Sequence, residues 1–260
     1  MHNYKRFLNN PWEILRVLGA KGYLTWIPDR TYLRIMYHAK LGKKLNLANP
    51  ITYNEKIQWL KLYNRNPQYT MMVDKFRVKQ YVCDKVGSQY VIPLLGVWDS
   101  PEDIDISILP DQFVLKCNHD SGTVIICKDK ANFDINGARK YLKKKMNRNY
   151  YRGGREWPYK NVERKIIAEP YLEDKKTGEL RDYKFFCFNG KAKLLFVATD
   201  RQNQSSETCF DFFDINYKHL NVRNGHPNAN RLPEKPIAFD LMIRLAEKLS
   251  EGIPHVRIDF

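Results

Sequence analysis

The sequence is poor in cysteine, and its cysteines form no disulfide or metal-binding pattern. Five of the 260 residues are cysteines, an odd number, and none belongs to a C-x-x-C pair. Disulfide-stapled domains and structural zinc sites normally use paired cysteines, so the sequence argues against both classes. A reducing setting fits this usage, and we expect the protein in the cytoplasm.

A long apolar run is also lacking. The first residues are not followed by the uninterrupted apolar segment of a signal peptide. The most apolar early stretch, residues 12–26, contains Glu13, Arg16 and Lys21, and it is too short and too charged to span a bilayer. We therefore expect a soluble protein, with the inner face of the membrane as a second candidate location.

Negative charge is scarce as well. The chain has 44 Lys and Arg against 29 Asp and Glu, a net charge of +15. This excess implies an anionic partner, and nucleic acid, nucleotide, acidic polysaccharide and anionic lipid headgroups are all candidates. With 43% hydrophobic and 28% charged residues, the chain is expected to be globular, as one large domain or two smaller ones.

The first 66 residues have a helical pattern, because apolar side chains recur at spacings of three and four. Thr52, followed three residues later by Glu55, matches a helix capping box. Basic and aromatic residues are frequent in this segment. Two interpretations are open: a docking surface for a membrane or an acceptor substrate, and a helical packing layer.

The most informative stretch is residues 113–127. It predicts a short apolar strand that carries Lys116, a polar loop with a glycine, and a second apolar strand. A lysine in a buried strand is costly unless an anion or a carboxylate meets its ammonium group. Side chains and backbone N–H groups of residues 119–123 are able to bind the same anion. Alone, the stretch also fits a hairpin with a surface lysine.

Two later strand patterns each place opposite charges on one face. Asp182 and Lys184 share a face of a strand that ends at Asn189-Gly190, a strong hairpin signal. Arg257 and Asp259 share a face of the last strand. A polar site and a cross-strand ion pair are both consistent with this pattern.

Two further segments allow other functions. Asp103 and Asp105 match the D-x-D pattern by which many glycosyltransferases hold a metal-bound sugar nucleotide. Residues 149–158 interleave arginines with aromatic side chains. That composition is typical of a surface for single-stranded nucleic acid, or of a mobile lid whose arginines reach phosphates. Neither common glycine-rich phosphate motif, G-x-x-x-x-G-K-[ST] or G-x-G-x-x-G, is present.

Five short segments occur in an order that resembles the ATP-grasp superfamily. They are Asp74-Lys75, Phe113-Val114-Leu115-Lys116 with its polar loop, residues 167–172, Asp182-Tyr183-Lys184 and Arg257-Ile258-Asp259-Phe260. The resemblance covers most of the chain from about residue 46 and includes residues 49–56. It is nearest to the branch named for the teichuronopeptide biosynthesis protein, which is associated with cell-surface polysaccharide loci.

The resemblance implies an α+β ATP-grasp fold, two α+β subdomains that grip ATP, behind an N-terminal helical region. The implied parts are residues 1–72 for the helical region, 73–160 for the first subdomain and 161–260 for the second. In the family, a second metal-binding carboxylate lies on a further strand, after the one that ends at Phe260 in this sequence. We therefore expect either a second subdomain cut short at its C-terminus or an incomplete metal site.

The resemblance also implies which residues bind ATP. These are Lys75, Lys116, His119, Ser121, Gly122, Thr123, Glu169, Tyr171, Leu172 and Asp182. Lys75 and Lys116 correspond to phosphate-contacting lysines under a mobile loop, residues 119–123. Residues 169–172 correspond to the hinge, where backbone groups and the Glu169 carboxylate contact adenine.

The remaining implied roles belong to the second subdomain. Asp182 corresponds to a ribose contact and Asp259 to a magnesium carboxylate. Lys184 and Arg257 are the implied catalytic residues, one near the γ-phosphate and the other facing the substrate or a phosphate.

The implied activity is ATP- and Mg-dependent carboxylate–amine ligation through an acylphosphate, in cell-surface polysaccharide biosynthesis of the cell envelope. The implied substrate is an acidic glycan or an amino acid, with peripheral membrane contact as a further expectation, and nucleic acid is not favoured. The alternatives are a glycosyltransferase, that is, a sugar-transferring transferase using Asp103 and Asp105, and a non-catalytic nucleotide- or polyanion-binding protein.

Overall fold

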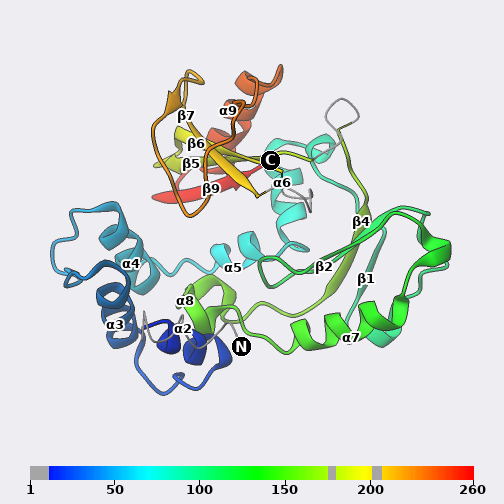
Figure 1. Cartoon of the computed structure of the whole chain (residues 1–260), viewed down its shortest axis with the longest axis horizontal. Coiled ribbons are helices and arrows are strands. Elements are labelled where there is room, and N and C mark those ends of the chain that lie inside the picture. The colour runs from blue at the N-terminus through cyan, green and yellow to red at the C-terminus, as the bar shows by residue number, and fades with distance from the viewer. Residues whose placement is uncertain (1–11, 175–179, 201–206) are drawn as a thin grey trace. The chain divides into compact units, whose positions relative to one another are not determined.

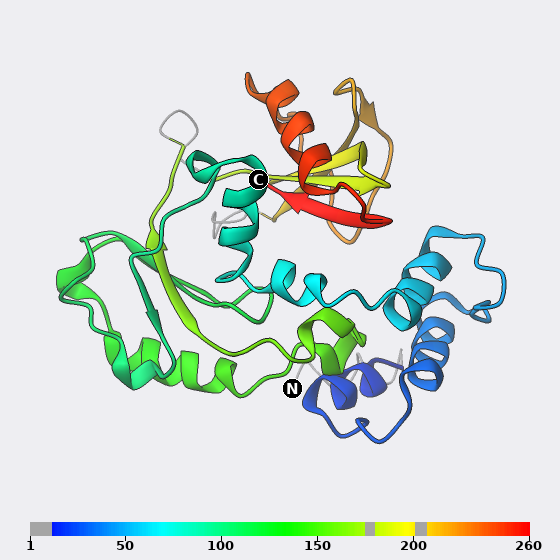
Figure 2. The same cartoon turned by 180° about the vertical axis from the view of Figure 1, so that it is seen from behind.

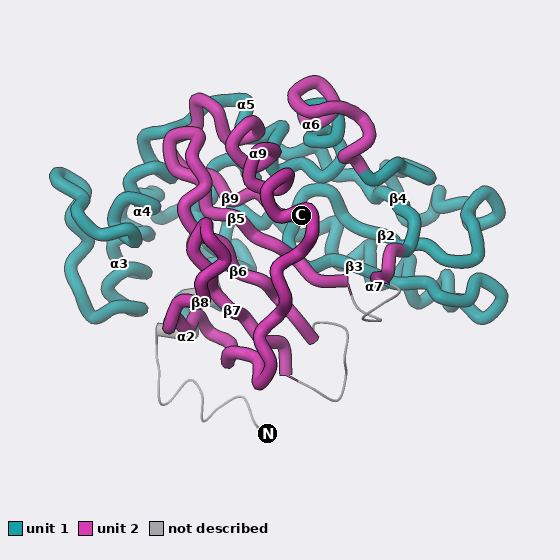
Figure 3. Tube along the Cα trace, turned by 90° about the horizontal axis from the view of Figure 1, so that it is seen from above, with its two compact units in different colours: residues 1–81, 92–171 teal, residues 82–91, 172–260 magenta. Residues whose placement is uncertain are grey.

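The computed structural model describes residues 12–174, 180–200 and 207–260. Two compact units divide the chain: unit 1 is residues 1–81 with 92–171, and unit 2 is residues 82–91 with 172–260 (Figure 3). None of the helices within the described residues combines the length and the apolar character needed to cross a membrane.

The helices of the first part of the chain lie in the blue and cyan segment of Figure 1. They are α2 (Trp12–Lys21), α3 (Asp29–Leu41), α4 (Tyr53–Tyr63), α5 (Gln68–Val73) and α6 (Val78–Val86). The expected capping box begins α4. Thr52 Oγ1 accepts a hydrogen bond from Glu55 N at 3.3 Å, and Glu55 Oε2 accepts one from Thr52 N at 2.9 Å.

One face of α3 belongs to a small hydrophobic core. Leu33 and Tyr37 of this helix pack with Leu45 and Leu47 from the segment that follows it, and Leu62 of α4 covers them. The helical packing layer is therefore confirmed for this face of α3. The opposite face is exposed.

Arg155 ties the helical region to a later segment of unit 1. Its side chain is 2% exposed, and its guanidinium group lies 4.3 Å above the ring of Tyr32. The guanidinium group also donates a hydrogen bond to Leu24 O at 2.6 Å and lies 3.5 Å from the Asp29 carboxylate. The prediction that the arginines of residues 149–158 belong to a mobile lid or a nucleic-acid surface is wrong for Arg155, because its charge is used inside the unit.

The sheet of unit 1 has the strand order β1-β4-β2-β3, and all neighbours are antiparallel. The strands are β1 (Gly96–Trp98), β2 (Phe113–Cys117), β3 (Val124–Cys127) and β4 (Ile166–Pro170). The helical segments between them are η2 (Pro101–Asp103), η3 (Lys130–Asn132), α7 (Ile135–Met146), α8 (Tyr151–Gly154) and η4 (Trp157–Tyr159).

One face of this sheet is a buried core. Phe113 and Leu115 of β2, Ile166 and Ala168 of β4 and Leu142 of α7 belong to one cluster of buried residues. Because side chains alternate along a strand, the remaining β2 and β4 side chains lie on the other face. That face carries the polar residues considered below.

Unit 2 is built on an antiparallel sheet of order β8-β7-β6-β5-β9. Its elements are η1 (Ser88–Tyr90), β5 (Asp182–Phe188), β6 (Lys191–Thr199), β7 (Cys209–Asp214), β8 (His219–Leu220), α9 (Phe239–Leu249) and β9 (His255–Asp259). Figure 2 shows α9 along this sheet, where Phe239 and Ala246 share a core with Phe185 and Leu195. The expected hairpin joins β5 to β6 through Asn189-Gly190, whose φ values are 48° and 75°.

The buried guanidinium group of Arg155 gives a stability prediction. Replacing Arg155 with methionine keeps an unbranched stem but leaves Leu24 O without its donor and Asp29 without this cation. We expect the free energy of unfolding to fall by about 3 kcal/mol, measured by urea unfolding. The control is Arg148→Met, an exposed arginine after α7, which should change stability by less than about 0.5 kcal/mol. Equal losses in the two variants would contradict the structural role.

Candidate functional site

Glu169 is the centre of a charged cluster on the polar face of the unit 1 sheet. Its carboxylate accepts from Lys116 Nζ through Oε2 and lies against Lys79 Nζ through Oε1, each at 2.5 Å. Lys116 comes from β2 and Lys79 from α6, and Lys79 Nζ also donates to Ile92 O at 2.7 Å. The β2–β4 register pairs Glu169 with Val114, so Lys116 is its diagonal neighbour on the same face.

The cluster holds more positive than negative charge. The Glu169 side chain is 6% exposed. Burial would raise the pKa of Glu169, but Lys116 and Lys79 outweigh burial and hold this pKa below its ordinary value. The carboxylate is thus ionised near neutral pH and shared by two ammonium groups. One positive charge is left over, and an anion is the natural partner for it.

Lys75 adds a further cation at the end of β2. Its Nζ donates to Cys117 O at 2.9 Å and to Asp120 O, and it lies 3.8 Å from the Asp120 carboxylate. Burial lowers the pKa of Lys75, the charge of Asp120 opposes this effect, and the charge of Lys116 adds to it. Lys75 and Lys116 therefore influence each other electrostatically, as two cations that serve one anion would.

A buried amide fixes the position of this lysine. Asp74 and Asn118 are 2% and 0% exposed. Asn118 Nδ2 donates to Asp74 Oδ1 at 2.8 Å and to Glu163 O at 2.8 Å, and its Oδ1 accepts from Lys165 N at 2.7 Å. Asn118 thereby joins the segment that carries Lys75, the end of β2 and the chain that enters β4.

The loop after β2 divides into anchors and an exposed tip. His119, Asp120 and Thr123 are buried, and Thr123 Oγ1 donates to Asp120 Oδ2. Burial also lowers the pKa of His119. Ser121 and Gly122 are exposed, and Gly122 has a φ of 94°, a conformation that suits glycine. The structure thus places two of the five predicted loop residues at the surface and the other three inside.

An exposed apolar strip lies beside Lys116. Val124 and Ile126 of β3 are 45% and 38% exposed. The register pairs Val124 with Lys116 and Ile126 with Val114, so the strip shares the face of the lysine. Apolar side chains next to anchored cations are suited to a flat ring that carries an anionic group.

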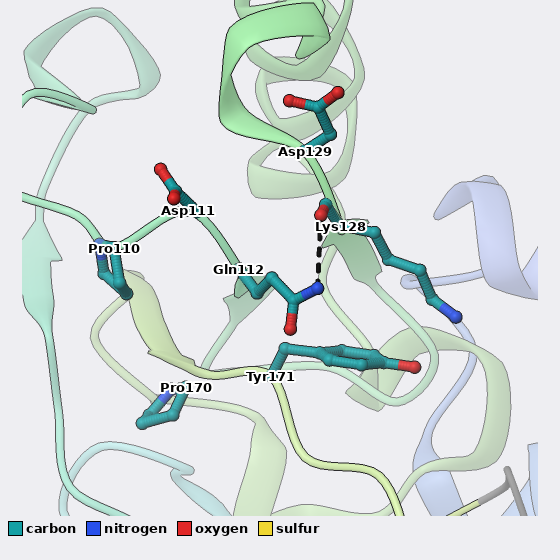
Figure 4. Close-up of a pocket in the computed structure, with 7 residues that line it drawn as sticks. All are labelled: Pro110, Asp111, Gln112, Lys128, Asp129, Pro170 and Tyr171. Atoms are coloured by element: carbon teal, nitrogen blue, oxygen red, sulfur yellow. Dashed lines mark hydrogen bonds between the residues drawn. The ribbon is translucent and has the colours of Figure 1, made fainter.

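A surface pocket of about 670 Å³ lies where β4 ends (Figure 4). It is lined by Pro110, Asp111, Gln112, Lys128, Asp129, Pro170 and Tyr171. Lys128 Nζ lies 5.0 Å from the centre of the Tyr171 ring, and Gln112 Nε2 donates to Lys128 O at 3.3 Å. The predicted residue Tyr171 thus belongs to a pocket wall, while Leu172 is the first residue of unit 2 in this part of the chain and is 41% exposed.

In unit 2, four charged side chains meet on one face of the sheet. Lys184 Nζ lies 2.7 Å from Asp259 Oδ2 and 3.4 Å from Asp182 Oδ2. Arg257 forms two parallel hydrogen bonds with the Asp259 carboxylate, at 2.7 and 2.8 Å. Lys184 and Asp259 are register partners across β5 and β9, so the cross-strand ion pair is present. Partial burial would raise the pKa of Asp259, but Arg257 and Lys184 lower it below its ordinary value.

The charged cluster of unit 2 offers a magnesium ion few carboxylate ligands. Within the described residues, no cluster of three or more His, Cys, Asp or Glu side chains could hold a metal ion. Both Asp259 oxygens already accept from Arg257, and one of them also bonds to Lys184. Magnesium is often held by one or two protein carboxylates together with phosphate oxygens and water, and Asp259 is able to serve as one such carboxylate.

Each unit thus carries anchored lysines on one face of an antiparallel sheet. A model of the family described as TupA-like ATPgrasp matches residues 55–260. The chain belongs to this family. The family and the α+β fold implied by the sequence resemblance are both confirmed.

Solved structures give weaker likenesses. The ATP-grasp ligase PsnB, complexed with a minimal precursor, is 9% identical over 92% of this chain and 60% of its own, with a TM-score of 0.41. D-alanine–D-alanine ligase from Bacillus anthracis, complexed with ATP, is 16% identical over 73% of this chain and 50% of its own, with a TM-score of 0.39. The chain thus spans little more than half the length of these proteins. No curated protein gave a significant match.

Sequence reasoning missed three parts of the site. Lys79 lies one helical turn after Lys75, a spacing that places two lysines on one side of a helix, and this was the available signal. Asn118 stands two residues after Lys116, but nothing local shows that its amide is buried. The exposure of Val124 and Ile126 has no local signal, because the strand looks like a core strand.

The lowered pKa of Glu169 gives a pH prediction. A depressed carboxyl pKa contributes stability that is present above the ordinary value of 4.5 and is lost as the pH falls below it. We expect Glu169→Gln to lower the free energy of unfolding by about 3 kcal/mol at pH 7, because two lysines lose their partner. The difference from the wild type should shrink as the pH falls from about 5 to about 3.

Urea unfolding across this pH range measures the effect. Glu251→Gln is the control, because Glu251 forms an exposed pair with Lys248. A difference between wild type and Glu169→Gln that stays constant with pH would show that the Glu169 carboxylate is not the titrating group.

Proposed function

We propose that the protein takes part in ATP- and Mg-dependent ligation of a carboxylate to an amine through an acylphosphate intermediate. The observation that carries this proposal is the Lys79–Glu169–Lys116 cluster with Lys75 beside it. Lys79 and Lys116 share the Glu169 carboxylate, and Lys75 lies beside Asp120. Three ammonium groups against two carboxylates leave net positive charge, next to a β3 strip that exposes apolar side chains. A nucleotide triphosphate has the matching chemistry.

In unit 1, Lys116 and Lys75 would contact the phosphates, with Ser121 and Gly122 as the exposed tip of the covering loop. His119 and Thr123 would contribute by anchoring that loop. Both Glu169 oxygens are bonded to lysines, so we propose that backbone groups of the hinge make the main adenine contacts, between Tyr171 and Leu172 as pocket walls.

In unit 2, Asp182 would contact the ribose, and Lys184 and Arg257 would contact the γ-phosphate and the substrate carboxylate. Lys184 and Arg257 would exchange their present partner, Asp259, for phosphate oxygens. A magnesium ion held there would neutralise phosphate charge during phosphoryl transfer. The protein side chains position the reactants and stabilise the developing negative charge.

We propose that the acceptor is an acidic glycan or an amino acid used in cell-surface polysaccharide biosynthesis, and that the protein works at the inner face of the membrane. The net charge of +15 supports an acidic acceptor and an anionic surface. We retain a three-part organisation, with a helical region at residues 1–72 and subdomains at residues 73–160 and 161–260.

The glycosyltransferase alternative has less support. Asp105 Oδ1 accepts from Ser107 N at 2.8 Å and from Ser107 Oγ at 2.6 Å, as in an ordinary turn. In the D-x-D pattern, Asp105 is therefore used to stabilise a turn at Ser107. Family membership also favours nucleotide-dependent ligation over sugar transfer.

Lys116 gives the first functional prediction. Replacing it with methionine removes one charged contact with the phosphates, so we expect ATP–Mg to bind about 10- to 100-fold more weakly, measured by titration calorimetry. Glu169→Ala should also weaken binding, because Lys116 and Lys79 lose their common partner. The charge-matched control, Lys140→Met on the exposed side of α7, should bind normally. Unchanged affinity in both site variants would refute the assigned nucleotide role.

Asp259 gives the second functional prediction. In Asp259→Asn, the enhancement of ATP binding by magnesium should fall about tenfold, because a neutral amide is a poor magnesium ligand. Without magnesium, ATP should bind at least as tightly as to the wild type, since a negative charge has been removed. Asp240→Asn on α9 is the control. Retained magnesium enhancement in Asp259→Asn would instead support a nucleotide-binding protein whose metal site lies elsewhere.

A further inference from the structure

The helical region carries a marked excess of positive charge. Residues 12–66 contain ten lysines and arginines but only three acidic residues. All of the residues assigned to ATP follow this segment, and none of its basic residues has a role in the proposed nucleotide site.

The exposed face of α3 carries much of this charge. Arg30, Arg34 and His38 are exposed and follow one another at intervals of four residues, which places them on one side of the helix. Arg34 and His38, together with Lys44 and Leu45, line a surface pocket of about 530 Å³. The walls of this pocket are mostly apolar atoms, so the aliphatic stems of Arg34 and Lys44 form much of it.

Nearby carboxylates do not neutralise this face. Asp29 faces Arg155 and Arg65, at 3.5 and 3.0 Å. Glu55 is used in the capping box of α4, where it accepts from Thr52 and from Ile51 N at 3.1 Å. Both acidic side chains that the structure describes in this region are therefore committed to other partners.

The loops that lead into and out of α3 expose large apolar side chains. Tyr23 and Trp26 are 65% and 77% exposed in the loop before the helix. Leu41 is 43% exposed at its end, and Ile51 is 71% exposed in the loop after it. Exposed aromatic and aliphatic groups in a basic segment are typical of segments that lie at a bilayer interface.

We propose that this α3 surface, defined by Tyr23, Trp26, Arg34, Lys44 and Ile51, docks the protein on an anionic phospholipid surface. The basic side chains would bind headgroup phosphates, and the apolar side chains would enter the boundary between headgroups and acyl chains. An acidic glycan in water would satisfy the charges but would leave Leu41 and Ile51 exposed. The inference deepens the proposed membrane location and rests on it, because it states which residues make the contact.

Vesicle co-sedimentation of the whole chain tests the proposal. Vesicles of phosphatidylcholine with phosphatidylglycerol should bind the protein, and vesicles of phosphatidylcholine alone should not. Arg34→Gln with Lys44→Gln should lower the partition coefficient about 25-fold, because each basic residue near an anionic surface contributes roughly fivefold. Trp26→Ala with Ile51→Ala should lower it on the order of tenfold.

Two controls test whether the loss of vesicle binding is specific to this surface or follows from any loss of charge or apolar area. Lys140→Gln with Lys144→Gln removes two exposed charges of α7, and Ile237→Ala removes an apolar side chain that is fully exposed in unit 2. Both should bind vesicles like the wild type. Equal binding to the two vesicle types, or equal losses in the control and test variants, would overturn the proposal.

Two further measurements distinguish the related hypotheses. Tighter binding to a soluble acidic polysaccharide such as polygalacturonate, with no binding to anionic vesicles, would identify a glycan surface and overturn membrane docking. ATP binding by the Arg34→Gln/Lys44→Gln variant should equal that of the wild type. Absent ATP binding with normal vesicle binding would refute the proposed function and leave the docking surface standing.

Discussion

The ion pair between Glu169 and Lys116 is the constraint on which the rest of unit 1 depends. A lysine in the middle of a sheet face is stable only if a negative charge meets it, and Glu169 meets both Lys116 and Lys79 at 2.5 Å. The requirement fixes the β2–β4 register and the position of α6, since all three elements must bring a charge to one point. Because one carboxylate serves two ammonium groups, each of these groups has a partner and the cluster keeps one net positive charge.

The need to hold buried cations in place also explains the many hydrogen bonds around Lys75. Lys75 loses favourable hydration through burial, so its backbone must be held firmly for its ammonium group to stay near β2. Asn118 does this by bonding Asp74 and the chain that enters β4. A buried amide with several partners has one stable orientation, because every lost hydrogen bond would leave a buried polar group unsatisfied. The position of the Lys75 ammonium group is therefore set by hydrogen bonds within the protein.

Whether a feature could be predicted depends on how far apart in the sequence its interacting residues are. The capping box of Thr52 and Glu55 and the hairpin at Asn189-Gly190 are decided by neighbouring residues, and both were predicted. Lys116 was recognised because a charge in an apolar strand violates a local pattern. The spacing of Lys79 from Lys75 was a weak signal and Arg155 gave none for burial, since their partners lie 90 and more than 120 positions away. The basic and aromatic composition of residues 149–158 therefore suggested a lid, whereas the structure buries the Arg155 cation.

Two groups of basic side chains differ in how their charge is matched. At the sheet face, lysines are matched to buried carboxylates and to backbone oxygens, so each position is specific. On α3, Arg34 and Lys44 line an exposed pocket, while Asp29 and Glu55 are committed to other groups. Matched charges in a partly buried site resist screening by salt, whereas exposed charges do not. An anion that binds the sheet face should therefore depend weakly on ionic strength, and one that binds α3 should depend on it strongly.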